Sequence, residues 1–276
     1  MGWILRVQLD TTTLDLASAV LWDAGTSGVA HLADDPSGPS GMSGVVAGFD
    51  TEAEASAAAD RLRSSLGAAA VAGAAVEPVD PSAWADPDRR VAATVAGYDL
   101  VLAPGAAFGD GGHPTTTLSL ELLAALDADH PVGGRTVVDF GTGTGVLTLA
   151  ALAHGAAEVV AVENDPAAVE AATATLALNP GLTGGRRVDV LTELPPEPEP
   201  AAAVLVNVLL PVHRAWGVAL QRWSAPDGGI VVSGILVDQE DAVRACYPDL
   251  SVMERRREGD WLGLLLAPAD RRRAAR

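Results

Sequence analysis

Lysine is missing from this chain of 276 residues, and all 18 of its basic side chains are arginine. The glycine-rich stretch GDGGHPTT at 109–116 therefore cannot be a phosphate-binding P-loop, because that motif needs a lysine to reach the outer phosphates. Cysteine is nearly absent as well. The single Cys246 excludes an internal disulfide and a cysteine-clustered metal site, and it fits a reducing compartment.

Long apolar runs and positive charge are also lacking. No uninterrupted apolar stretch reaches the ~18 residues that span a bilayer, and Asp10 comes too early for a signal peptide. We therefore expect a cytoplasmic protein that does not contact a membrane. The formal charge of -18 opposes direct binding to a phosphate backbone and would attract a basic partner, although it also serves plain solubility. The five histidines show no metal-ligand spacing, so no metal is expected.

The first 80 residues alternate between strand-like and helix-like patterns in the order βαββαβ. This is the plan of a ferredoxin-like α+β domain. Thr51 and Glu54 have the spacing of a helix capping box. Because no cluster of chemically reactive side chains stands out here, we predict a substrate-recognition domain. The expected segments are 3–9, 14–25, 28–33, 44–49, 51–67 and 70–79.

Residues 81–104 contain three prolines and little helical periodicity, which predicts a linker passing into extended structure. From residue 105 to 268, strands and helices alternate, as in a Rossmann-like α/β domain with a mostly parallel sheet. Two strand-like segments around Gly259 predict an antiparallel hairpin at the end of that sheet. Residues 269–276 form a basic tail.

The stretch VVDFGTGTGVLTLAAL at 137–152 reads as a strand, a glycine turn and a helix. Its G-x-G-x-G spacing differs from the G-x-G-x-x-G of dinucleotide folds and is the pattern of S-adenosylmethionine enzymes. Gly141 and Gly143 let the chain turn tightly beneath the cofactor, and Asp139 can reach its ammonium group. Glu163, at the end of the next strand, can accept hydrogen bonds from a ribose diol. The alternative is a plain glycine turn with a solvated Glu163.

Asn207 closes an apolar strand that we expect beside the strand carrying Asp139. A buried amide without partners costs about 1–3 kcal/mol, so this asparagine is expected to have a role. It could accept a hydrogen bond from an amine nucleophile and line the path of the transferred methyl group. The alternative is an asparagine that caps a turn.

Together, the stretches AFGDGGHPTT, DFGTGTG, VNVL and SGIL and the ferredoxin-like start resemble the ribosomal protein L11 methyltransferase family. The resemblance implies a class I S-adenosylmethionine-dependent methyltransferase that N-methylates lysine side chains or the terminal amine of a basic ribosomal protein. By matching position, it places cofactor contacts at Thr116, Gly141, Glu163 and Asn207. From the residues themselves we also expect Asn207 to be the catalytic residue and Asp139 and Gly143 to be further cofactor contacts. We expect a monomer.

The chain departs from the family pattern in three places. Asp110 and Gly112 replace two threonines of the usual GTGTHPTT loop, Glu163 stands where an aspartate is common, and the linker around Trp84 is short. Two alternatives therefore stay open. One is a methyltransferase acting on another protein or a small-molecule amine, and the other is a module that binds S-adenosylmethionine without turnover.

Overall fold

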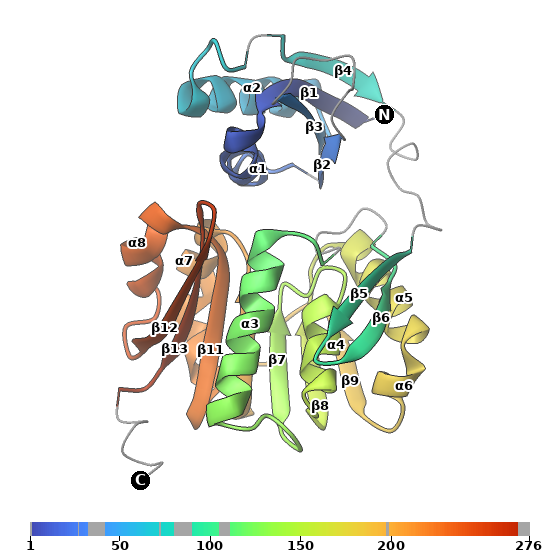
Figure 1. The fold of residues 1–276 in the computed structure, drawn as a ribbon, viewed down its shortest axis with the longest axis vertical. Coiled ribbons are helices and arrows are strands. Elements are labelled where there is room, and N and C mark those ends of the chain that lie inside the picture. Colours follow the sequence, from blue (N-terminus) through green and yellow to red (C-terminus); the bar gives the residue numbers. More distant parts are fainter. Residues whose placement is uncertain are drawn as a thin grey trace. The chain divides into compact units, whose positions relative to one another are not determined.

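The computed structural model describes residues 2–26, 28–32, 42–71, 73–79, 90–104, 111–196 and 199–269. The chain divides into two compact units, Met1–Asp86 and Pro87–Arg276 (Figure 1). The predicted recognition role of the first unit stays a prediction. Trp84, Gly105 and Asp110, which bear on the sequence-based expectations, lie outside the described residues.

The N-terminal unit has the predicted βαββαβ order, with helices packed on one face of a four-stranded antiparallel sheet in the order β2-β3-β1-β4. Leu5, Val7 and Leu9 alternate along β1 and are buried with the helices, as expected for a sheet with one covered face. The capping box of Thr51 and Glu54 is present. The elements are β1 (Gly2–Asp10), α1 (Leu14–Asp23), β2 (Gly28–Leu32), β3 (Met42–Phe49), α2 (Glu52–Leu66) and β4 (Ala75–Val79).

The linker predicted over 81–104 requires a correction in its second half. Here β5 (Val91–Val95) and β6 (Tyr98–Leu102) form an antiparallel hairpin. Leu100 and Leu102 are fully buried with the core of the C-terminal unit. Each of these short strands buries only one of its two faces, against distant parts of the C-terminal unit. Its sequence alone therefore resembles that of an extended linker. The C-terminal unit thus begins before residue 105.

The C-terminal unit is built on a seven-stranded sheet in the order β12-β13-β11-β10-β7-β8-β9 (Figure 1). Strands β7 to β11 run parallel to one another, whereas β13 is antiparallel to both β11 and β12, which confirms the predicted terminal hairpin. The elements are α3 (Pro114–Asp129), β7 (Thr136–Phe140), α4 (Val146–Ala153), β8 (Glu158–Val162), α5 (Pro166–Leu178), α6 (Pro180–Thr183), β9 (Arg187–Leu191), β10 (Ala201–Asn207), α7 (Leu210–Leu220), β11 (Ser224–Leu236), α8 (Glu240–Arg244), β12 (Ser251–Glu258) and β13 (Trp261–Ala267).

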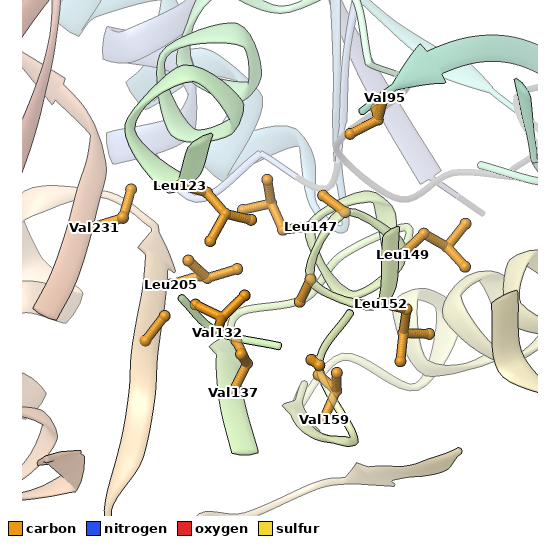
Figure 2. Close-up of a cluster of buried hydrophobic side chains, with 14 of the residues drawn as sticks. Val95, Leu123, Val132, Val137, Leu147, Leu149, Leu152, Val159, Leu205 and Val231 are labelled. Carbon is orange, nitrogen blue, oxygen red and sulfur yellow. The ribbon is translucent and has the colours of Figure 1, made fainter. Parts of the chain in front are cut away.

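Both faces of this sheet are covered, as a parallel sheet requires. On one face, α3 and α4 pack against alternate residues of the strands, and α6 and the β5–β6 hairpin pack on these helices and on α5 within the same core. Figure 2 shows Leu147, Leu149 and Leu152 of α4 within this core, with Leu123 of α3 and Leu205 of β10 nearby. The intervening strand residues face α7 and α8 on the opposite side. This two-sided packing fixes the carboxyl ends of β7, β8, β10 and β11 at one edge.

Candidate functional site

The candidate site lies at the carboxyl ends of the parallel strands, where open α/β sheets bind their ligands. Five segments contribute to it. They are the first turn of α3, the glycine turn after β7, the end of β8, the end of β10 and the end of β11. In Figure 1, α3 and α4 lie in front of this sheet, and their N-terminal ends face the same edge.

The glycine turn between β7 and α4 requires backbone conformations that favour glycine. Gly141, Gly143 and Gly145 have φ angles of 76°, 55° and 82°, in the left-handed region that side chains disfavour. A Cβ atom on Gly141 would lie 2.5 Å from Val208 Cγ1, so glycine is needed there for space as well. Since Val208 follows Asn207, the turn after β7 packs directly against the end of β10.

Asp139 is completely buried at the end of β7. Its Oδ2 accepts hydrogen bonds from the hydroxyls of Thr142, at 2.6 Å, and Thr148, at 2.8 Å. Its Oδ1 is buried and has no hydrogen-bond partner among the described residues. Burial raises the pKa of this carboxyl to about 6, against the lowering effect of the two threonine hydrogen bonds. A buried acceptor of this kind favours a cationic or strongly hydrogen-bonding ligand.

Glu163 follows β8 and is half-buried. One of its oxygens, Oε2, accepts a hydrogen bond from Gly143 N at 3.0 Å. The other, Oε1, accepts from the backbone N–H groups of Asn164, at 2.9 Å, and Asp165, at 3.1 Å. The carboxylate therefore ties the glycine turn to the start of α5. Because an ionised carboxylate offers about four acceptor positions, a bond to a ligand hydroxyl is still possible.

Asn207 ends β10 and lies beside Ser233 of the parallel strand β11. Its position is one residue beyond Val206, which pairs with Phe140 at the end of β7. The side-chain oxygen Oδ1 is buried without a hydrogen-bond partner among the described residues. This satisfies the expectation of a buried polar group at the ligand-binding edge, and its role in catalysis stays a prediction.

Thr116 lies in the first turn of α3, where His113 is the N-cap residue and Pro114 the first helical residue. Its backbone N–H donates to the carbonyl of His113 at 2.9 Å. The Thr116 side chain is fully buried, and Oγ1 has no partner among the described residues. The helix start thus holds a third buried polar atom available to a ligand.

Direct contacts connect each of these segments to the next one along the edge formed by the carboxyl ends of the strands. Ser233 Oγ donates to Thr115 O at 3.0 Å, which joins β11 to α3. Ser233 pairs in register with Asn207, Val208 packs against Gly141, and Gly143 bonds to Glu163. The structure therefore brings together all the site residues predicted from the sequence. Their buried acceptors suit a small, polar, positively charged ligand.

Sequence reasoning missed several residues at this edge. Thr142 and Thr148 hold the Asp139 carboxylate, and their spacing within GTGTGVLT is the only sequence signal for them. Trp261 opens β13, and its ring packs edge to face with His113 at a centroid distance of 5.0 Å. Among the described residues, no group of His, Cys, Asp and Glu side chains could hold a metal ion. None of the described helices has the length and apolar character needed to cross a membrane.

Comparison with known sequences identifies relatives of this chain. A family model described as ribosomal protein L11 methyltransferase (PrmA) matches residues 79–267. A ribosomal protein L11 methyltransferase of Pelobacter propionicus is 42% identical over 181 residues, covering 64% of this chain and 56% of that protein. A protein of the same name from Stenotrophomonas maltophilia is 39% identical over 165 residues, 58% of this chain and 52% of its own length. The matched region thus spans about half the length of these relatives.

Comparison with solved structures supports the same fold. A ribosomal protein L11 methylase from Lactobacillus delbrueckii subsp. bulgaricus is 26% identical with a TM-score of 0.52, covering 60% of this chain and 83% of that one. A T. thermophilus 16S rRNA methyltransferase is 19% identical with a TM-score of 0.54, covering 97% of this chain and 65% of that one. At this low identity the second similarity concerns the fold alone. The C-terminal unit has the class I S-adenosylmethionine-dependent methyltransferase fold.

Proposed function

Since this chain belongs to the ribosomal protein L11 methyltransferase family, we propose that it transfers methyl groups from S-adenosylmethionine to amines of ribosomal protein L11. The acceptors in this proposal are lysine side chains, the terminal amine or both. The observation that carries the proposal is a set of three buried polar atoms at one edge of the sheet that have no partners among the described residues. They are Asp139 Oδ1, Thr116 Oγ1 and Asn207 Oδ1.

The residues at this edge fit S-adenosylmethionine. Asp139 Oδ1 would accept from the ammonium group of the cofactor, which is the partner that a buried carboxylate needs most. Gly141 and Gly143 add no side chains of their own where the chain turns, and Glu163 would accept from a ribose hydroxyl. Thr116 would contact the cofactor from the start of α3. When bound, the cofactor supplies a reactive methyl group on a sulfonium sulfur.

Asn207 would orient the attacking amine. Its buried Oδ1 can accept a hydrogen bond from an N–H of the acceptor and thereby direct the nitrogen lone pair away from itself. Holding two reactants in line accounts for much of the rate enhancement of such a reaction. Lysine has an ordinary pKa of ~10.4 and is mostly protonated in water at neutral pH. A site closed to water disfavours the charged form and so favours the neutral amine that attacks. No strong base among the chain's residues is required for this role.

The charge of the chain supports a basic protein as substrate. The sequence carries 36 acidic and 18 basic side chains, and such an excess attracts positively charged proteins over the range of a Debye length. A ribosomal protein is a partner of this kind. We also propose a cytoplasmic location, because a ribosomal protein is made and assembled there.

A transfer assay tests the proposal. The purified chain is incubated with labelled S-adenosylmethionine and unmethylated L11, and with a small primary amine as the competing acceptor. Label should enter L11 and appear as mass increases of one or more methyl groups on amines. At saturating S-adenosylmethionine, Asn207→Ala should lower the single-turnover rate by about 100-fold, because it removes the group that aligns the amine.

Two glycine variants provide matched controls. Gly141→Arg introduces a side chain at a φ of 76° where a Cβ would meet Val208, whereas Gly185→Arg has a φ of 78° with nothing within 4 Å of its Cβ. Both variants carry similar backbone strain, and they differ in whether the new side chain meets Val208 at the site. Only Gly141→Arg should therefore abolish transfer. Labelling of the small amine in place of L11 would reassign the substrate. Tight cofactor binding with no transfer to either acceptor would indicate a binding module.

A further inference from the structure

A hydrogen bond connects β11 to the first turn of α3 across the top of the sheet. Ser233 Oγ donates to the carbonyl oxygen of Thr115 at 3.0 Å, and the two residues are 118 positions apart in the sequence. Both side chains are almost completely buried. The accepting carbonyl belongs to the residue directly before Thr116. The bond therefore sets where this threonine lies relative to the end of β11.

Ser233 is itself held in place from the opposite face of the sheet. Its carbonyl oxygen lies 3.2 Å from Nε2 of the fully buried His213 on α7. Since a carbonyl can only accept, Nε2 carries the proton, and Nδ1 accepts from the Tyr247 hydroxyl at 2.8 Å. Burial lowers the pKa of His213 to about 4, so the ring stays neutral and keeps this arrangement near pH 7.

We propose that Ser233 is a positioning residue of the cofactor site, which ties the start of α3, with Thr116, to the strand beside Asn207. This inference rests on the proposed function. Ser233 and Asn207 are register partners in the parallel strands β11 and β10. A serine at this position thus holds two site segments in a fixed relation, one through its side chain and the other through the strand pairing.

The Thr115 carbonyl has a second donor, which separates positioning from simple stability. Ser119 Oγ donates to the same oxygen at 2.8 Å from within α3. Loss of the Ser233 hydroxyl therefore leaves the carbonyl with a partner, so the penalty of an unsatisfied buried acceptor is avoided. The connection between α3 and β11 is nevertheless lost. Loss of the Ser119 hydroxyl also leaves the carbonyl with one of these donors, Ser233. In that variant, however, the connection between α3 and β11 remains.

The test compares Ser233→Ala with the matched variant Ser119→Ala in the full chain. S-adenosylmethionine affinity is measured by calorimetry well below the unfolding temperature, and Tm is recorded for each variant. Ser233→Ala should weaken binding by about three- to ten-fold, as expected from a lost hydrogen bond of ordinary strength. Ser119→Ala should bind within about twofold of the wild type. Hydrogen exchange without ligand should be faster at the Thr116 and Thr117 amides in Ser233→Ala only.

The outcomes separate this inference from the proposed function. A wild-type chain that fails to bind S-adenosylmethionine overturns the proposed function, whatever the exchange data show. A wild-type chain that binds it, with Ser233→Ala binding equally well or with both variants weakened equally, overturns the positioning role alone. Lower Tm values with unchanged affinity and unchanged exchange at α3 would show that Ser233 is merely structural.

Discussion

Asp139 shows how a single residue of the candidate site trades stability for binding. The carboxyl is fully buried, and two threonine hydroxyls compensate only one of its oxygens. Burial raises its pKa to about 6 from an ordinary 3.8, and the nearby charge of Glu163 adds to the shift. An ionised Asp139 is therefore destabilising near pH 7, unless a cation such as the proposed ammonium group lies against it.

Replacement of Asp139 by asparagine should stabilise the chain without ligand at neutral pH. Between pH 3.8 and pH 6 the folded chain binds more protons than the unfolded one, so stability falls as the pH rises through this range. The amide of the variant cannot titrate. The advantage of Asp139→Asn in free energy of unfolding should therefore grow by about 1–2 kcal/mol between about pH 5 and about pH 7.5. Urea unfolding of both proteins at the two pH values measures this difference.

The same variant should bind S-adenosylmethionine poorly, because the amide carries no charge. Wild-type affinity should decline as the pH falls below about 6, by at most about tenfold per pH unit, as Asp139 becomes protonated. Affinity that is independent of pH in the wild type, or equal stability differences at both pH values, would argue against a buried ionisable partner for the cofactor.

For single residues of the site, the sequence indicated which residues take part but not which hydrogen bonds they form. Asp139, Gly141 and Glu163 were predictable because their spacing along a strand, a turn and a strand is fixed by local geometry. The bond from Gly143 N to Glu163 was not, since it depends on how β7 and β8 pair. The link between Ser233 and Thr115 joins residues far apart in the sequence, and no local pattern indicates it.

Among the elements, the β5–β6 hairpin is attached to α5 through hydrogen bonds with two side chains, those of Asn179 and Thr175. The Asn179 side chain, at the end of α5, accepts from Val101 N at 3.1 Å and donates to Val101 O at 2.8 Å. Thr175 Oγ1 accepts from Ala103 N at 3.0 Å. These side chains replace the hydrogen bonds that another strand would give to the edge of β6, and they anchor the hairpin on the C-terminal unit.

Asn179→Ala should destabilise the C-terminal unit by about 1–3 kcal/mol, because it leaves the backbone groups of Val101 without these partners. Thr173→Ala on the same helix removes a hydroxyl that bonds only within the exposed surface of α5 and should be nearly neutral. Urea unfolding of the two variants, with amide exchange at Val101, measures the contrast. Equal and small effects in both would mean that the hairpin is held by apolar packing alone.

Element prediction succeeded where periodicity was long and failed where it was short. The alternation of strands and helices after residue 132 is strong because each element buries one face or both. The sequence VDQEDAVRACY over 237–247 predicts one helix, but the structure divides this segment into a 3-10 helix, η4 (Val237–Gln239), and α8. The hairpin over 91–102 was interpreted as linker, since its two five-residue strands gain their stability only from packing on distant elements.

For the whole molecule, the excess of acidic side chains is the property that concerns its partner most. Twice as many acidic as basic residues give a formal charge of -18. Among the described residues, the ion pairs of arginine are mostly exposed, as with Arg63 and Asp60, and contribute little to stability. We therefore attribute the charge to solubility and, under the proposed function, to the attraction of a basic substrate.

Transfer to L11 should depend on ionic strength. Raising the salt concentration from about 50 mM to about 500 mM should lower kcat/KM for L11 by about tenfold or more, because screening weakens the steering of a basic protein. Affinity for S-adenosylmethionine, which rests on buried contacts, should change far less. Equal salt sensitivity of cofactor binding and of transfer would contradict electrostatic recognition of the protein substrate.

The mass of L11 made in cells shows directly whether this chain methylates that protein. The chain and the L11 encoded in the same genome are produced together in a bacterium that lacks its own L11 methyltransferase, and L11 is purified from its ribosomes. We expect added methyl groups on amines of L11 with the wild-type chain and with Gly185→Arg, and none with Gly141→Arg. Unmodified L11 beside a folded wild-type chain that binds S-adenosylmethionine would contradict the proposed substrate.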